Sequence, residues 1–454
     1  MRLYVVIVQA FELYVTMGKN YRWQQGGKNL KDVEVLIERG VLVGVNLQKD
    51  EHFDYSMEEL ANLAQALDVE VVGMVTQNLE RVTPSHYVGT GKIEEIKAFF
   101  DETDANIVIF NDELSPSQIR NLERDLQCKV IDRTMLILDI FSRRAKTREA
   151  QLQVELAQLQ YMLPRLVGLH ASLSRQGGGT GGGFKNRGAG ETKLELDRRK
   201  IEDQISKIKK ELESVKEQRE TQRKQRRKNA VPVVSIVGYT NAGKSTIMNQ
   251  LLAKAGQDAT KQVFEKDMLF ATLETSVRNI ELEDNKSFLL TDTVGFVSKL
   301  PHHLVKAFRS TLEEARESDL LLHVVDVSNE EYRFMMEVTN ETLKAIDVEN
   351  IPTIYVYNKS DLAEVEYPLV SGDNIWLSAK EDVGLEELLQ QIKQQIFANY
   401  VTCQMLIPYN QGGIVSYLNE QATVLETEYE EEGTLLTLEL KEADYQKYEI
   451  YVVK

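Results

Sequence analysis

The sequence predicts a multidomain α/β protein, and three observations support this fold class. The chain has 454 residues, whereas one domain takes roughly 150 residues. Apolar runs of strand length alternate with helical patterns at residues 33–141 and again at residues 231–399, as in doubly wound parallel sheets. Residues 142–230 carry apolar stripes with helical spacing. We assign residues 1–32 to an N-terminal extension and residues 400–454 to a small α+β domain.

The composition, 42% hydrophobic and 28% charged, is that of a globular protein and excludes disordered and fibrous classes. Two cysteines, Cys128 and Cys403, are too few for a disulfide framework or a multi-cysteine zinc site. We expect two inert thiols in a reducing cytoplasm. The apolar segment Leu3–Val15 is too short to span a membrane and lacks a signal-peptide cleavage pattern. It predicts either a buried strand or an extension of the reading frame ahead of Met17.

In the first α/β domain, strands are expected at residues 41–47, 69–75, 107–110 and 129–131, with helices at 57–67, 93–100 and 119–126. The run Gly89–Lys92 looks like half of a phosphate loop. His86 stands where that motif needs its first glycine. We therefore predict a structural turn, which gives ATP binding by this domain little support.

Residues 142–230 predict a helical hairpin arm. Its tip, Gly177–Gly190, holds eight glycines in fourteen residues and is expected to be a flexible loop. Pro164 is expected to end the first helix, and Glu191–Lys193 to open the second. The two predicted stripes are Leu152, Leu156, Leu159 and Leu163, and Ile201, Ile205, Ile208, Leu212 and Val215.

Charge is unevenly distributed along the chain. The net charge is −17, yet residues 141–230 carry 22 basic and 11 acidic side chains. Within residues 141–190 the ratio is eight basic to two acidic. A basic, glycine-rich backbone can follow RNA phosphates, so we predict contact with nucleic acid. The alternative is a solvated spacer, and the basic run Arg219–Lys228 fits the solvated end of a helix.

Gly238–Ser245 matches the phosphate-loop pattern directly after a predicted strand and before a helical run. In such a loop, backbone N–H groups surround the β-phosphate, Lys244 contacts β- and γ-oxygens, and Ser245 supplies a ligand to Mg²⁺. Downstream, Asp292 and Gly295 follow a strand, where the carboxylate can hold the metal through water and the glycine N–H can meet the γ-phosphate. Thr272 is the expected second hydroxyl ligand, with Thr275 and Ser276 as competitors.

A later strand leads into Asn358-Lys-Ser-Asp361. One carboxylate, that of Asp361, can accept from both N1–H and N2–H₂ of guanine, a donor pair that adenine lacks. Ser378–Lys380 follows another strand and is expected to back the guanine ring. Predicted nucleotide-binding residues are Gly238, Tyr239, Thr240, Asn241, Ala242, Gly243, Lys244, Ser245, Thr246, Asp292, Gly295, Asn358, Lys359, Asp361, Ser378, Ala379 and Lys380; predicted catalytic residues are Lys244, Thr272, Asn241 and Gly295; predicted metal ligands are Ser245, Thr272 and Asp292.

These motifs resemble those of the HflX family of ribosome-associated GTPases over nearly the whole chain. The resemblance implies a P-loop GTPase that uses GTP and Mg²⁺, binds the large ribosomal subunit and its RNA through the arm, and splits or rescues stalled ribosomes. It also implies a cytoplasmic protein, partly ribosome-associated, monomeric when free and without a membrane span. The segments similar to family signatures are Val71–Gln77, Tyr87–Lys92, Arg187–Glu195, Val237–Thr246, Leu269–Leu273 and Asp292–Phe296.

The chain departs from the family pattern in its switch and arm loops. Glu274–Ser276 stands where an Asp-Pro-Thr type of segment is usual, and Ala189 where proline is common. The run Gly177–Gly183 also looks like an expansion of the glycine loop. These changes leave stress rescue and antibiotic resistance both open, and a GTPase switch in ribosome assembly would share every nucleotide motif.

The position after Gly295 is Phe296, where Ras-like enzymes keep the glutamine that orients water. A phenyl ring cannot orient water, so slow intrinsic hydrolysis is expected, with acceleration by large subunits that order Phe270–Arg278 and Asp292–Lys299. Asn241 resembles the phosphate-loop asparagine of GTPases that use K⁺. The alternative is a residue that only shapes the loop.

Overall fold

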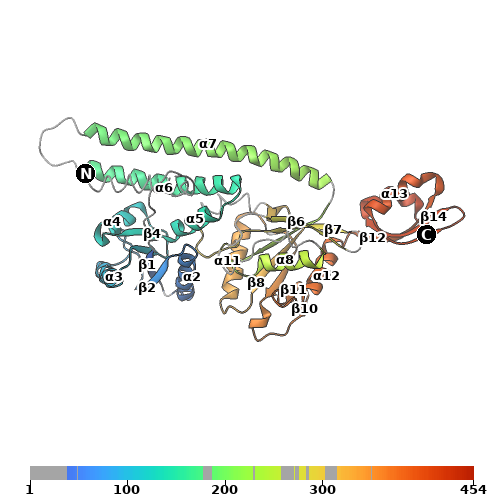
Figure 1. Cartoon of the computed structure of the whole chain (residues 1–454), viewed down its shortest axis with the longest axis horizontal. Coiled ribbons are helices and arrows are strands. Elements are labelled where there is room, and N and C mark those ends of the chain that lie inside the picture. The colour runs from blue at the N-terminus through green and yellow to red at the C-terminus, as the bar shows by residue number, and fades with distance from the viewer. Residues whose placement is uncertain are drawn as a thin grey trace, which may run out of the picture. The chain divides into compact units, whose positions relative to one another are not determined.

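The computed structural model describes residues 38–48, 50–176, 187–228, 231–256, 270, 276–282, 286–301, 314–348 and 350–453. It divides into two compact units, Met1–Asp50 with Met57–Arg143, and Glu51–Ser56 with Arg144–Lys454 (Figure 1). The predicted N-terminal extension, including Leu3–Val15, lies outside the described residues. Within the described ranges, no helix has the length and apolarity needed to cross a membrane.

The first unit is built on a four-stranded parallel sheet in the order β2-β1-β3-β4. All four residues of β3 are buried, as expected for a parallel strand covered on both faces. The alternation predicted from the sequence is therefore found, with strand β2 running four residues further than expected. The elements are β1 (Arg39–Leu47), α2 (Phe53–Gln65), β2 (Glu70–Leu79), α3 (Thr90–Glu102), β3 (Ile107–Phe110), α4 (Pro116–Leu126), β4 (Lys129–Asp132) and α5 (Arg133–Arg144).

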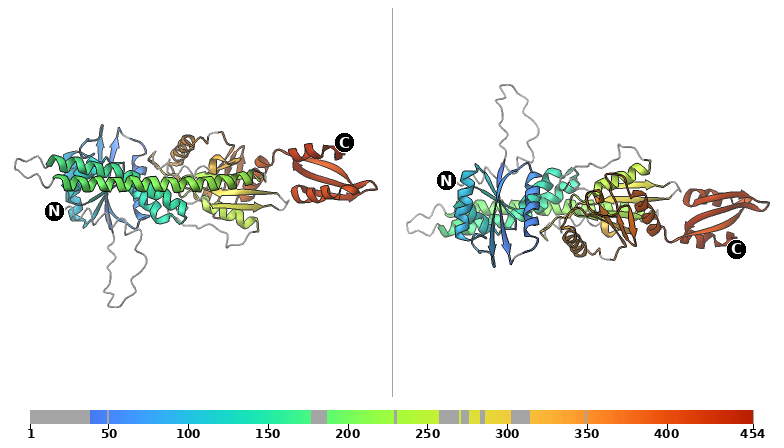
Figure 2. Two further views of the ribbon diagram at one scale, coloured as in Figure 1. Left: turned by 90° about the horizontal axis from the view of Figure 1, so that it is seen from above. Right: turned by 90° about the horizontal axis from the view of Figure 1, so that it is seen from below.

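The arm consists of two long helices, α6 (Arg148–Gln176) and α7 (Arg187–Lys228), which lie side by side (Figures 1 and 2). Two ion pairs join them, Arg148 to Glu211 at 2.8 Å and Arg219 to Glu149 at 2.7 Å. On α7, Ile201, Ile205 and Ile208 of the predicted stripe are buried, and Leu212 and Val215 are half-buried. On α6, Leu152 of the predicted stripe is buried, but Leu156, Leu159 and Leu163 are only half-buried. The more buried line runs through Ala150, Val154, Ala157 and Tyr161.

Two expected helix ends in the arm are wrong. Helix α6 continues through Pro164 to Gln176, and α7 begins at Arg187 rather than at Glu191–Lys193. An internal proline removes one backbone hydrogen bond and strains the turn before it, but packing along two long helices can offset a local defect of this size. Residues 177–186 of the glycine-rich tip lie outside the described part of the chain.

A seven-stranded sheet in the order β10-β11-β9-β8-β5-β7-β6 carries the second α/β region. Its five central strands are parallel and its two edge strands antiparallel. Helices α8 and α12 pack on the face that contains Ile236, and α11 on the face that contains Val237. The elements are β5 (Val233–Gly238), α8 (Lys244–Lys254), β6 (Ser276–Glu281), β7 (Ser287–Asp292), β8 (Leu320–Asp326), α11 (Tyr332–Ala345), β9 (Thr353–Asn358), the 3₁₀ turn η2 (Ser360–Leu362), β10 (Leu369–Ser371), β11 (Asn374–Trp376) and α12 (Leu385–Ile396).

The C-terminal region has the predicted order of strand, helix, strand, strand, followed by a further helix. Its antiparallel sheet has the order β12-β14-β13, and helix α13 packs on it through Leu418. Lys286, just before β7, forms an ion pair with Glu439 of β14 at 2.7 Å. The elements are β12 (Tyr400–Pro408), η3 (Tyr409–Gln411), α13 (Gly412–Gln421), β13 (Thr423–Tyr429), β14 (Gly433–Lys441), α14 (Glu442–Tyr448) and η4 (Glu449–Tyr451).

Candidate nucleotide-binding site

The phosphate-loop segment turns sharply between the end of β5 and the start of α8. Gly238 has φ +145° and Gly243 has φ +94°, conformations that side chains rarely allow. A Cβ on Gly238 would lie 2.2 Å from the carbonyl oxygen of Val324, and one on Gly243 would lie 2.2 Å from Nδ2 of Asn358. Both positions therefore require glycine, for conformation and for space.

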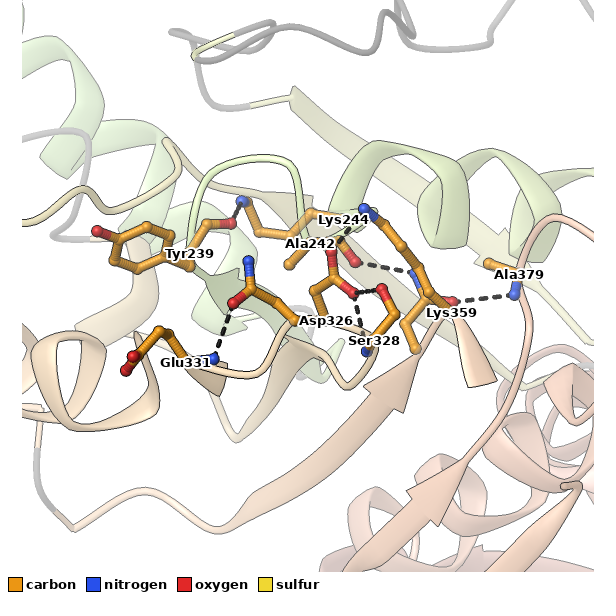
Figure 3. A network of polar contacts seen from close by, with 10 residues as sticks. Tyr239, Ala242, Lys244, Asp326, Ser328, Glu331, Lys359 and Ala379 are labelled. Atoms are coloured by element: carbon orange, nitrogen blue, oxygen red, sulfur yellow. Dashed lines mark hydrogen bonds and ion pairs between the residues drawn. The ribbon is translucent and has the colours of Figure 1, made fainter. Parts of the chain in front are cut away.

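Lys244 lies inside this turn and is only 7% exposed. Its ammonium donates to the carbonyl oxygen of Tyr239 at 2.6 Å (Figure 3). Burial lowers the pKa of Lys244 to about 8, although the nearby Asp292 carboxylate acts in the opposite direction. Gly295 lies close to the Lys244 ammonium, since a Cβ on Gly295 would be 2.9 Å from Nζ of Lys244. The lysine is thus a desolvated cation that an anionic phosphate would stabilise.

Two oxygen-bearing side chains meet at the start of α8. The hydroxyl of Ser245 donates to Oδ2 of Asp292 at 2.8 Å, and Asp292 is fully buried at the end of β7. Hydroxyl and carboxylate oxygens are the ligands that Mg²⁺ takes beside nucleotide phosphates, so this pair fits the predicted metal. Thr272, the third predicted ligand, lies outside the described residues, as does Thr275.

The segment after Gly295 is joined to the phosphate loop by three hydrogen bonds. Thr240 N donates to Phe296 O at 2.8 Å, and Phe296 N donates to Gly238 O at 3.2 Å. Ser298 N donates to the hydroxyl oxygen of Tyr239 at 2.6 Å. The phenyl ring of Phe296 is 2% exposed and packs in the core with Tyr239. The side chain at this position therefore has no polar group for water.

Asn358 connects the phosphate loop to the segment after β11. Its Nδ2 donates to Ala242 O at 2.9 Å, and its Oδ1 accepts from Ala379 N at 3.0 Å (Figure 3). On the adjacent turn, Oδ1 of Asp361 accepts from the hydroxyl of Ser378 at 2.6 Å. These contacts bring together the two motifs that the sequence predicts for the base.

The sequence prediction missed one contact of this site. Asp326, the last residue of β8, accepts from Nζ of Lys359 at 2.7 Å. Its other oxygen accepts from the backbone N and the hydroxyl of Ser328 at 3.2 and 2.6 Å. A carboxylate at the end of a strand that is apolar apart from His323 was the available signal, because parallel strand ends share one edge of a sheet.

The structure brings the predicted nucleotide residues to the carboxyl ends of parallel strands, with Thr272 outside the described part. Asn241 is exposed and has φ +61°, and Lys380 is also exposed. The individual roles of these residues stay predictions. Their joint arrangement can hold a polyphosphate at one end and a planar base at the other.

The chain is similar to known proteins in sequence and to one solved structure described here. Family models match at residues 54–142 (GTP-binding GTPase N-terminal), 144–226 (GTP-binding GTPase Middle Region) and 233–359 (50S ribosome-binding GTPase). A solved GTP-binding protein from Sulfolobus solfataricus in complex with GDP is 25% identical, with a TM-score of 0.41 over 79% of this chain and 98% of that one.

Curated relatives named GTPase HflX cover most of the chain. The relative from Caldanaerobacter subterraneus subsp. tengcongensis is 45% identical over 411 residues, which is 89% of this chain and 92% of that protein. The relative from Lacrimispora saccharolytica is 47% identical over 407 residues, 89% of this chain and 93% of that protein. With the three family models in order along its length, the chain belongs to the HflX family of GTPases.

Proposed function

We propose that the chain binds GTP with its phosphates on Gly238–Thr246 and its base between Asn358–Asp361 and Ser378–Lys380. The observation that carries this proposal is Asn358, which hydrogen-bonds both the phosphate loop and Ala379. One residue thus fixes the spacing between the phosphate end and the base end of the site. Ser245 and Asp292, with Thr272, would hold Mg²⁺, which neutralises charge on the phosphates.

Hydrolysis needs a group that places water and a group that balances charge in the transition state. Lys244 supplies one buried positive charge, and the Gly295 backbone N–H can meet the γ-phosphate. Phe296 supplies neither function, because its apolar ring is buried. We propose that the chain alone therefore turns over slowly, and that a bound partner orders the catalytic arrangement.

We further propose that this partner is the large ribosomal subunit, and that GTP-dependent binding splits or rescues stalled ribosomes. The model that matches residues 233–359 is described as a 50S ribosome-binding GTPase, and the arm carries eight basic and two acidic side chains in residues 141–190. Phosphate contacts by such a segment release counterions, so binding should weaken with salt. The chain would then work in the cytoplasm, as a monomer when free.

Sedimentation of ribosomes with the protein and a non-hydrolysable GTP analogue tests the proposal. We expect the protein to migrate with large subunits and the fraction of intact ribosomes to fall. Migration with immature particles alone would favour a role in assembly instead. Splitting that occurs only with drug-stalled ribosomes would favour antibiotic resistance.

A charge-matched pair of variants tests the role of the arm. Replacing Arg175, Lys185 and Arg187 with alanine should shorten residence on large subunits across a salt series without changing GTP affinity. Replacing the exposed Lys207, Lys209 and Lys210 removes the same charge from the mixed-charge part of α7 and should have a smaller effect. Equal behaviour of the two triple variants would favour the spacer interpretation.

A further inference from the structure

Strands β8 and β9 end side by side at the base end of the site. Asp326, the last residue of β8, pairs in parallel register with Asn358, the last residue of β9. Val327 N donates to Asn358 O at 3.1 Å, which keeps the two chain segments together beyond the strands. Lys359 follows directly, and its ammonium donates to Oδ2 of Asp326 at 2.7 Å (Figure 3). The carboxylate at the end of β8 thus holds the lysine that follows β9.

The carboxylate of Asp326 is fixed before it meets Lys359. Its Oδ1 accepts two hydrogen bonds from Ser328, so its Oδ2 is directed toward the lysine. The side chains of Asp326 and Lys359 are 16% and 26% exposed. Because water screens this ion pair less than a pair on the open surface, its attraction is stronger than that of an ordinary surface salt bridge.

Lys359 also has a constrained backbone. Its φ is +61°, and it is the residue from which the turn η2, carrying Asp361, begins. Its four-carbon stem has many rotamers in solution, and a planar ligand packed on it would restrict them. Holding the ammonium in advance lowers the entropy lost when the ligand binds.

We infer that Asp326 is a positioning residue for the guanine nucleotide. It holds Lys359 so that the apolar stem of the lysine lies against the base beside Asp361, and it acts through Lys359 without touching the nucleotide. This inference rests on the proposed placement of the base at Asn358–Asp361. It goes beyond that placement because it assigns part of the nucleotide affinity to a residue outside the motif.

The test measures GDP affinity by calorimetry and the steady-state kinetics of GTP hydrolysis. Asp326→Asn preserves the size of the side chain and can still accept from Ser328, but it removes the charge. Affinity for GDP should fall about fivefold or more, and KM for GTP should rise while kcat stays unchanged. Asp326→Glu restores the charge and should recover part of the lost affinity. Ser328→Ala removes the hydroxyl bond to Asp326 but leaves the backbone bond and the pair with Lys359, so it should weaken GDP binding less than Asp326→Asn does.

A double-mutant cycle separates positioning from a general loss of structure. Lys359→Met preserves an unbranched apolar stem without its charge and should also weaken GDP binding. The double variant Asp326→Asn with Lys359→Met should bind no more weakly than Lys359→Met alone, because both changes break one contact.

Three results would overturn the inference: unchanged GDP affinity for Asp326→Asn, losses that multiply in the double variant, or equal weakening by Asp326→Asn and Asp326→Glu. If the unmodified protein bound no GDP, the proposed nucleotide site itself would fail, and this would be seen before any variant was made. Should Asp326→Asn not fold, Asp326→Ser takes its place in the same cycle, because it also removes the charge that holds Lys359.

Discussion

In the described part of the chain, Gly91–Lys92 and Gly243–Lys244 each stand at the start of a helix, and their backbones differ. Gly91–Lys92 lies inside the first turn of α3, whose cap residue Gly89 has extended backbone angles (φ −70°, ψ 156°). Gly243–Lys244 opens α8 from a left-handed glycine with φ +94°. The dipeptide is the same in both places. The curl of the backbone before the helix is what can direct N–H groups toward one phosphate.

The two lysines differ as their backbones do. Lys92 forms an ion pair with Glu95 on its own helix at 2.6 Å. Lys244 is buried beneath the loop and donates to the carbonyl oxygen of Tyr239. Lys92 is therefore satisfied as an ordinary helix residue, whereas Lys244 has surroundings that an anion would improve. The segment Gly89–Lys92 is thus the start of helix α3 and not the separate turn that the sequence predicts, and it lacks the left-handed glycine found before α8.

The most direct way to test the comparison is to remove each lysine in turn. Lys244→Ala should lower kcat/KM for GTP by about 100-fold or more, because it removes the charge that meets the β- and γ-phosphates. Lys92→Ala should leave GTP hydrolysis unchanged and cost stability only through the lost pair with Glu95. Steady-state phosphate release measures both. A comparable loss from Lys92→Ala would show that the N-terminal sheet takes part in nucleotide chemistry.

The two glycines provide a second matched pair. Gly243→Ala forces a side chain into φ +94° and against Asn358, so GDP affinity should fall by about tenfold or more, since such strain costs roughly 1–3 kcal/mol. A Cβ on Gly91 has no atom within 4 Å, so Gly91→Ala should raise the free energy of unfolding by up to about 1 kcal/mol. Calorimetry and chemical denaturation measure these effects. Loss of nucleotide binding in Gly91→Ala would contradict the comparison.

The same contrast explains what the sequence could predict. The phosphate loop was predictable because its strand, curl and helix occupy one short stretch, and β3 was found within its predicted bounds because all four of its residues are buried. The contact between Asp326 and Lys359 was not, because it joins residues 33 positions apart. It depends on which strands become neighbours, and no local pattern specifies that.

In the arm, local sequence patterns gave predictions that the structure contradicts. Pro164 predicts a helix end from local backbone preference, yet α6 continues beyond it. Beyond Leu152, which is buried, the buried side of α6 also lies off the leucine stripe, on Val154, Ala157 and Tyr161. Small residues such as alanine let two helices approach closely. Which side of α6 is buried therefore depends on how α7 packs against it, and not only on the size of its apolar residues. Sequence periodicity predicts that a helix forms, but it does not predict which side of the helix faces its partner.

Base selectivity gives the next largest expected effect. Asp361→Asn should weaken GTP binding by about one order of magnitude or more, because it replaces an acceptor of two guanine donors by an amide. It should gain affinity for xanthosine nucleotides, where the amide can donate to the base. Competition calorimetry with both nucleotides checks the exchange. Unchanged GTP affinity would remove Asp361 from the site.

The pH dependence of binding gives a further test of the buried lysine. The pKa of Lys244 is lowered to about 8 by burial, and a bound phosphate would favour the charged form and raise that pKa. GTP affinity should therefore be greatest below pH 8 and decline by up to about tenfold per pH unit above it. Binding above pH 8 should take up a proton, which calorimetry in buffers of different ionisation enthalpy detects. Affinity that stays flat from pH 7 to 9.5 would contradict the assignment.

The smallest expected effect concerns Asn241. If its side chain helps to hold K⁺ beside the phosphates, hydrolysis should be faster in K⁺ than in Na⁺ by roughly tenfold, or about 1.4 kcal/mol of barrier. Because Asn241 has φ +61°, Asn241→Ala would add backbone strain, whereas Asn241→Gly removes the side chain and tolerates this conformation. The glycine variant should lose the difference between the cations and still bind GDP.

These rates should be measured with and without large ribosomal subunits, since intrinsic turnover is expected to be slow. A glycine variant that retains the preference for K⁺ would leave Asn241 as a residue that shapes the loop. Fast turnover by the unmodified protein alone, indifferent to cation and to subunits, would mean that a catalytic group outside the predicted set acts within this chain. Phe296 is not that group, because its apolar ring is buried against Tyr239.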